Sequence, residues 1–163
     1  ADRLTIGEDY VDTNIGTGTA VARVGGVLNV NTTSQATTGT SEEVLATYTL
    51  PANTLSANGK AIRVTAWANT AANTNSKTLR VRFGGAAGTA IGSATTSTSA
   101  ASLSITATLV RTGAATQVAN GSAVGNTAPT QTLSGAVDIV VTGATATAAG
   151  DLTFIAVLIE VLN

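Results

Sequence analysis

The sequence predicts an all-β protein, an antiparallel sandwich or jelly roll. Short runs of alternating apolar and polar residues recur from residue 27 onward, and such alternation is typical of strands with one buried face. Turn-forming Gly, Asn and Ser residues separate the runs. No helix-length stretch places apolar residues at spacings of three and four. Many short strands joined by such turns favour a two-layer β architecture.

Residues 1–25 differ from the rest of the chain and are predicted to form an extended N-terminal arm. Charged residues mix there with isolated apolar ones, and the pairs Gly16/Gly18 and Gly25/Gly26 interrupt any regular element. Two interpretations are open: a frayed terminus, or an arm that docks on a neighbouring molecule. The docking interpretation assigns the contacts to Leu4, Ile6, Tyr10, Val11 and Ile15. The sandwich itself is then predicted to span residues 26–163.

The strand predictions follow the chain in order. Residues 27–30 and 43–50 form the first strands. Four later runs each place apolar residues on one face: Ile62, Val64, Ala66 and Ala68; Leu79, Val81 and Phe83; Leu103, Ile105, Ala107 and Leu109; Val137, Ile139 and Val141, with Asp138 and Thr142 facing outward. Asn58-Gly59 is a tight-turn pair. The Gly-, Ala-, Ser- and Thr-rich segment 86–102 is open to two interpretations, a flexible linker or an irregular strand.

The last strand, over residues 151–162, is apolar on both faces. We expect Ile155, Val157, Ile159 and Val161 to face the core of the subunit. The other face, carrying Phe154, Leu158 and Leu162, is then predicted to meet a second copy of the chain, because an uncovered apolar strand is an aggregation hazard. The alternative is a central strand covered within the subunit.

Composition argues against catalysis, metal binding and cofactors. The 163 residues include no His, Cys or Met, so the commonest general base and the commonest transition-metal ligands are missing. Scattered acidic residues, among them Glu8, Asp9 and Asp12, do not follow a calcium-loop spacing. We therefore expect no enzyme activity, no cofactor and no metal site.

The charge and hydropathy of the chain argue against nucleic-acid and membrane partners. The net charge is −1 and only 10% of the residues are charged, which gives no field toward nucleic acid or an acidic membrane. The start of the chain lacks the pattern of a signal peptide, and the longest apolar run, 154–159, is far shorter than the roughly 20 residues of a membrane helix. We expect a soluble protein.

Individual polar and aromatic residues have ordinary interpretations. Glu42 and Glu43 are expected to pair with Arg80 or Arg82 across strands, in a surface contact worth at most about 1 kcal/mol. Trp67 is interpreted as filler of the core or of an interface. Hydrophobic residues make up 44% of the chain but aromatic ones only 3%, so the core of one subunit is predicted to be thin. Burial of further surface between copies, and hence oligomerisation, is expected.

Residues 45–85 resemble a segment that recurs in virion proteins of tailed bacteriophages. The matching features are Leu-Pro-Ala-Asn-Thr-Leu at 50–55, Asn58-Gly59, Trp67, the Asn-rich run 73–78 and Phe-Gly-Gly at 83–85. The likeness covers about a quarter of the chain, and outside it only the composition is similar. It implies a jelly-roll module that forms trimers, used as a capsid decoration (cement) protein or as the head of a tail fibre.

The short arm before a single β-domain favours the decoration role over the fibre role. The resemblance then implies a homotrimer on the outer capsid surface of a virion assembled in the host cytoplasm, with the major capsid protein as partner. The alternative is a tail-fibre or spike head whose loops, residues 69–76 and 112–130, bind a host receptor. A bacterial surface or adhesin module is the third interpretation.

Overall fold

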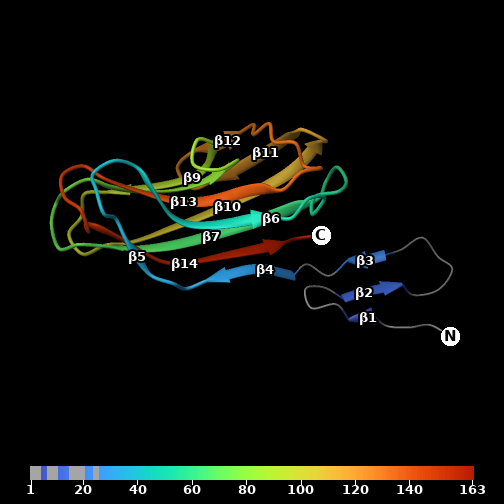
Figure 1. Ribbon diagram of the computed structural model, residues 1–163, viewed down its shortest axis with the longest axis horizontal. Helices are drawn as coiled ribbons and strands as arrows, with labels where there is room; N and C mark the ends of the chain where they lie inside the picture. Colours follow the sequence, from blue (N-terminus) through green and yellow to red (C-terminus); the bar gives the residue numbers. More distant parts are fainter. Residues whose placement is uncertain (1–4, 7–10, 15–20, 24–25) are drawn as a thin grey trace.

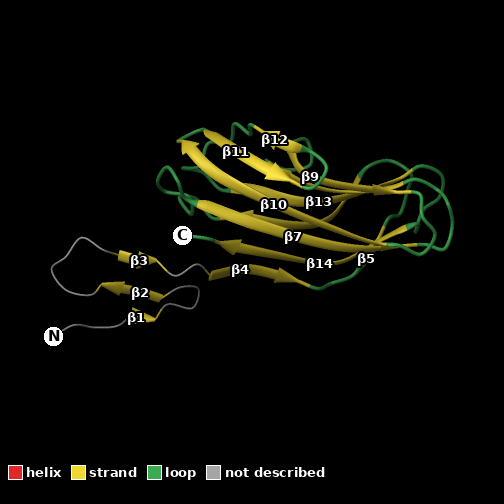
Figure 2. Ribbon diagram, turned by 180° about the vertical axis from the view of Figure 1, so that it is seen from behind, coloured by secondary structure: helices red, strands yellow, loops and turns green. Residues whose placement is uncertain are grey.

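The computed structural model describes residues 5–6, 11–14, 21–23 and 26–163, with side chains from residue 26 onward, and every regular element in them is a β-strand (Figures 1 and 2). β1 (Thr5–Ile6), β2 (Val11–Asn14) and β3 (Val21–Arg23) pair in an antiparallel three-stranded sheet of their own. β1 and β2 precede Gly16, and β3 lies between Gly18 and Gly25, whereas Gly26, which was expected to interrupt regular structure, begins β4. No helix of the described chain is long and apolar enough to cross a membrane.

Two larger sheets face each other as the layers of a sandwich. The larger has seven strands: β4 (Gly26–Asn31), β5 (Gln35–Ala36), β7 (Ala61–Thr70), β10 (Ser102–Gly113), β11 (Thr116–Gly121), β12 (Gly125–Thr127) and β14 (Leu152–Val161). Its order is β12-β11-β10-β7-β14-β4, with β5 also paired to β14. The smaller has four strands in the order β6-β13-β8-β9: β6 (Glu43–Leu50), β13 (Val137–Thr145), β8 (Lys77–Phe83) and β9 (Thr89–Thr96).

The connectivity of the sandwich is that of a jelly roll. Four antiparallel pairs are nested along the chain: β8 with β9, β7 with β10, β6 with β13 and β4 with β14. Two of these pairs lie in each sheet, which is the arrangement produced when a long hairpin is rolled up. The predicted all-β class is confirmed, and the pairing itself selects the jelly roll over other sandwiches. The hairpin of β11 and β12 is an addition that widens the larger sheet.

The core lies between the sheets and consists of the inward residues of each strand. All four predicted apolar runs are buried there, and Ile62, Val81 and Phe83 are fully inaccessible. The segment 86–102 proves to contain a strand, β9, with Ile91 buried against the core. Its composition has a packing reason, because a Cβ placed on Gly92 would lie 2.5 Å from Ile105 Cγ2.

Candidate interaction surface

The final strand, β14, switches its core face part of the way along. Phe154 pairs with Ala68 and Ala156 pairs with Trp67, so Ile155 is an extra residue at a β-bulge. Because one inserted residue reverses the alternation, Leu152 and Phe154 face the core before the bulge, and Val157 and Ile159 face it afterwards.

This bulge corrects two predictions. Phe154 was expected at a contact between copies, but its side chain is fully buried inside the subunit. Ile155 was expected in the core, but it is 36% exposed. Strict two-residue alternation had been assumed along the whole strand, and no residue in 151–162 signals a bulge, since the sequence there is apolar on both sides.

The remaining predicted contact residues lie on the outer face of the larger sheet. Leu158 is partly exposed, and Leu162 just beyond the end of β14 is exposed. Leu158 pairs across the ladder with Val30 of β4, and Glu160 pairs with Val27. Val30 is 58% exposed and Val27 is 49% exposed. We call Val27, Val30, Leu158 and Leu162 the apolar strip.

The apolar strip borders an open sheet edge. β4 is the last strand of its sheet, and none of the described residues pairs with its free side. Its sequence, GVLNVN, has no charge and no proline, which are the usual protections of an edge strand. A strand was expected over residues 27–30, but its exposed face was not. A register shift opposite Ile159 and Glu160 puts Val27 and Val30 on one face although they are three residues apart.

Two charged side chains on the outer face of the larger sheet form an ion pair. Arg63 of β7 donates from Nε and Nη2 to Glu160 Oε2 at 3.0 and 2.8 Å. This pair lies between the ends of the apolar strip, because Glu160 is also the cross-strand neighbour of Val27. The surface formed by β7, β14 and β4 therefore presents apolar groups and a neutralised ion pair.

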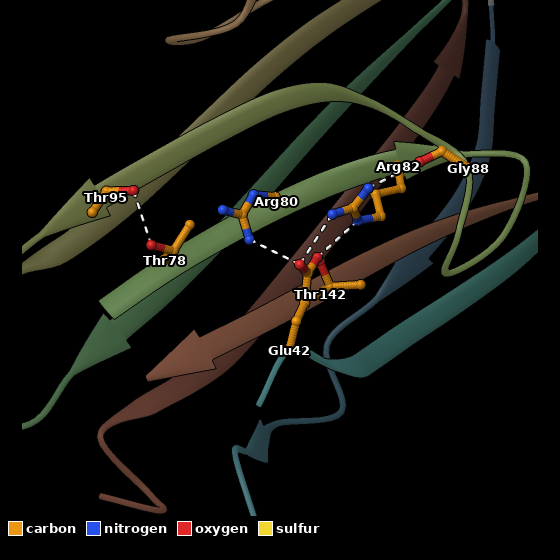
Figure 3. Close-up of polar contacts among 7 residues, drawn as sticks. All are labelled: Glu42, Thr78, Arg80, Arg82, Gly88, Thr95 and Thr142. Carbon is orange, nitrogen blue, oxygen red and sulfur yellow. Dashed lines mark hydrogen bonds and ion pairs between the residues drawn. The ribbon is translucent and has the colours of Figure 1, made fainter. Parts of the chain in front are cut away.

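The outer face of the smaller sheet is built around Glu42 (Figure 3). Its carboxylate accepts hydrogen bonds from Arg82 Nε at 2.7 Å, Arg80 Nη1 at 2.9 Å and the Thr142 hydroxyl at 2.6 Å. The hydrogen bond from Arg82 is the main cause that lowers the pKa of Glu42 to about 2, with further contributions from Thr142 and Arg80 and with burial opposing. The expected pairing of Glu42 with Arg80 or Arg82 is confirmed, and the structure pairs it with both arginines.

Glu43 has a different role from the one expected. Its carboxylate accepts hydrogen bonds from the backbone N–H groups of Thr38 and Gly39 and from the Thr38 hydroxyl. These bonds lower the pKa of Glu43 below its usual value. Glu43 thus closes the turn before β6 instead of pairing with an arginine.

The first receptor-loop candidate, residues 69–76, begins with the last two residues of β7, and its loop part is held by a partly buried polar network. Asp151 accepts hydrogen bonds from the side-chain amides of Asn73 and Asn75, both at 2.7 Å. These bonds, with the charge of Lys77 as a smaller cause, lower the pKa of Asp151. Lys77 is fully buried and donates to the Asn73 carbonyl at 2.6 Å. This burial could have been predicted from the sequence, because Lys77, Leu79 and Val81 occupy alternate positions of β8 and therefore point to the same, buried face.

The second receptor-loop candidate, residues 112–130, is mostly not a loop. It contains β11 and β12, which extend the larger sheet beyond β10. The buried Gln117 side chain fixes the segment that follows β12. Its amide oxygen accepts from the Gln131 N–H at 2.9 Å, and its amide nitrogen donates to the Gln131 carbonyl at 2.8 Å. Threonine- and glycine-rich composition made this hairpin indistinguishable from a loop in the sequence.

Trp67 lies outside the core. It is on the outer face of β7 and 38% exposed, so the core part of the earlier interpretation is wrong. Of the predicted docking residues of the arm, Leu4, Tyr10 and Ile15 lie outside the described residues, and Ile6 and Val11 belong to β1 and β2. The docking role of the arm stays a prediction. Within the described ranges, no three His, Cys, Asp or Glu residues group where they could hold a metal ion.

No protein-family model and no curated protein matches this chain. Among solved structures it is similar to a pilus protein of Bacillus endospore appendages, at 14% identity over 93% of this chain and 100% of that one, with a TM-score of 0.49. It is also similar to the sugar-binding EclA C-terminal domain, at 11% identity over 90% and 89% and a TM-score of 0.47.

A third likeness is to the CBM2 module of the evolved Dit protein of Lactobacillus casei BL23 phage J-1, at 9% identity over 72% and 69% and a TM-score of 0.36. At these identities the matches concern the fold, and they single out no family. The class of protein established at this point is an all-β jelly-roll module.

Proposed function

We propose that this protein is a structural protein of a bacteriophage virion, a capsid decoration (cement) protein that trimerises on the head surface and stabilises the shell. The observation that carries the proposal is the apolar strip beside the open edge of β4. Two valines about half exposed on an unprotected edge strand are an aggregation hazard in a lone subunit. Contact with copies of the same chain covers them.

The resemblance to tailed-phage virion proteins supports the choice of setting. Its motif residues have clear structural roles in this fold: Leu50 and Leu55 are buried, and Asn53 and Gly59 take positive φ values of 62° and 88°. The matched segment therefore forms the turns between β6, β7 and β8. The trimeric state and the major capsid protein as partner come from the resemblance.

A shell-bound trimer stabilises a capsid by attaching at several points at once. Once one subunit is bound, the next contact forms within the same assembly at a high effective concentration, so weak individual contacts add up to firm attachment. In this proposal Leu158 and Leu162 contribute to the contact between copies, and the arm over residues 1–25 reaches the capsid proteins.

The first test is the oligomeric state of the purified chain at micromolar concentration. We expect a species three times the 16.0 kDa mass of the chain. Val30→Lys and Leu158→Lys should shift it to the monomer, whereas Val118→Lys should not. Val118 is the matched control, because it is 43% exposed on β11 at the other end of the same sheet. A stable monomer of the unmodified protein would refute the self-association.

The second test is the location and effect of the protein on purified particles. A decoration protein lies on the head, and particles stripped of it lose thermal or mechanical robustness but still adsorb to cells. Labelling at the tail tip, with loss of adsorption on stripping, would instead support the tail-fibre head. Deletion of residues 1–25 tests the arm, because unchanged attachment to the head would contradict its docking role.

A further inference from the structure

Trp67 stands on the larger sheet with small neighbours on both sides. Its cross-strand partners are Ser104 on β10 and Ala156 on β14. Neither side chain is large enough to cover an indole, and 38% of Trp67 stays exposed. An exposed tryptophan combines a flat apolar surface with an N–H donor, a combination enriched where proteins bind partners.

A row of free hydroxyls lies next to this indole. Ser104, Thr106 and Thr108 occupy alternate, outward positions of β10, and Thr65 pairs with Thr106 from β7. None of these four side-chain hydroxyls has a hydrogen-bond partner within the described part of the chain. Three alternate strand residues extend over about 14 Å, so the row offers donors and acceptors along a line.

On the smaller sheet, three outward hydroxyls are bonded to neighbouring side chains: Thr78 to Thr95 at 2.9 Å, Thr49 to Asp138 at 2.7 Å, and Thr142 to Glu42. Thr47 of β6 is exposed without such a bond, but it stands alone and has no tryptophan among its cross-strand neighbours.

On β10 the hydroxyls near the two ends are bonded, Ser102 to Asn69 at 3.1 Å and Thr112 to Thr116 at 3.2 Å. The hydroxyls of Ser104, Thr106 and Thr108 between them have no bonded side chain within the described part of the chain. They are available to a ligand.

The surface around Trp67 is also uncharged. The nearest charged side chain on β7 is Arg63, which is paired with Glu160 at 2.8 Å. A ligand that fits must therefore be neutral, present an apolar face to the indole, and carry several hydroxyls at its edges. A chain of uncharged hexopyranose units has this chemistry, with C–H groups on the ring faces and hydroxyls around them.

We propose that the outer face of β7 and β10 binds a neutral polysaccharide, with one sugar ring stacked on Trp67 and adjoining units hydrogen-bonded to Ser104, Thr106 and Thr108. This activity goes beyond the proposed decoration role. The face adjoins the apolar strip but extends away from it, because β10 and β4 lie on opposite sides of β7 and β14 in the sheet order. Self-association and glycan binding therefore use neighbouring, separable surfaces.

The test uses the intrinsic fluorescence of Trp67, because it is the only tryptophan of the chain. The probes are cellohexaose, maltohexaose and hexa-N-acetylchitohexaose, followed by an array of neutral glycans. We expect a saturable change of emission with at least one glycan. Calorimetry should show that Trp67→Ala lowers the affinity about tenfold or more, and that Ser104→Ala and Thr108→Val each lower it severalfold. Thr78→Val, on the other sheet, is the control and should bind normally.

Two results would overturn the proposal. One is the absence of binding to every neutral glycan on the array by the folded protein. The other is a Trp67→Ala variant that keeps its thermal unfolding transition and glycan binding but loses oligomerisation, which would make Trp67 a protein contact. Both readouts use the purified protein, so they stay independent of whether the protein proves to lie on a phage head.

Discussion

Phe154 and Ile155 are adjacent in β14, and the bulge at Ile155 predicts very different losses of stability when each is truncated to Ala. Phe154→Ala removes a fully buried ring that lies in the core with Leu152 and Val157. Truncations of buried aromatic residues cost about 3–5 kcal/mol. For a chain of this size each kcal/mol lowers Tm by about 2–4 °C, so we expect a decrease of roughly 10 °C.

Ile155→Ala should cost about 1 kcal/mol or less, because its side chain is already 36% exposed at the bulge. The assay is urea and thermal unfolding of the two variants beside the unmodified protein, with the denaturant slope checked for two-state behaviour. The same contrast should recur after the bulge, where Val157→Ala is costly and Leu158→Ala is mild. Equal costs for Phe154→Ala and Ile155→Ala would refute the register derived for β14.

Three further predictions concern polar groups and close packing. Because the folded-state pKa of Glu42 is depressed to about 2 from 4.5, its stabilisation is complete above about pH 4.5 and is lost as the pH falls toward 2. Thermal unfolding should show this loss, about 1 kcal/mol for a partly exposed group, and Glu42→Gln should abolish the pH-dependent part. Asp151→Ala should free the loop 69–76, measured as faster amide exchange there with unchanged exchange in β13. Gly121→Ala should destabilise by about 1–3 kcal/mol, since its Cβ would lie 2.0 Å from the Ile91 carbonyl oxygen, whereas Gly39→Ala meets no atom within 4 Å and should be neutral.

The fold was predictable because most strands have one buried face. Ile62, Leu79, Ile105 and Ile139 each mark a run whose alternation the structure reproduces, and in such runs the core requirement fixes both the strand and its orientation. Pairing between distant strands was not readable from the alternation. The jelly roll came from the resemblance and was then confirmed by the nested pairs in the structure.

The candidate surface was only partly predictable, because register shifts decide it. A bulge in β14 puts Phe154 inside and Ile155 outside, and another in β4, at Leu28, puts Val27 and Val30 on the same face. Each bulge inserts one residue into an otherwise alternating strand. Where the strand is apolar on both faces, no polar residue shows which positions face outward, so the position of the bulge cannot be predicted from the sequence. Trp67 was interpreted as filler of the core or of an interface, but its exposure depends on the small partners Ser104 and Ala156, which are known only from the register.

The two outer faces of the sandwich differ in how far their side chains are covered or bonded within the subunit. This difference indicates that the larger sheet is the one that contacts partners. On the smaller sheet the outward Val140 is buried, since Arg82 and Thr47 flank it across the neighbouring strands, while Val44 near the start of β6 is 37% exposed. The two arginines there are paired with Glu42. On the larger sheet the valines of β4 are exposed, and the hydroxyls of Ser104, Thr106 and Thr108 on β10 have no bonded side chain among the described residues. Such groups contribute little to the stability of one subunit, because in the isolated chain they face water. Substitutions of outward-facing residues on β4, β7, β10 and β14 should therefore change association or glycan binding with little effect on the free energy of unfolding. Substitutions of outward-facing residues around Glu42 should lower the free energy of unfolding with little effect on association or glycan binding.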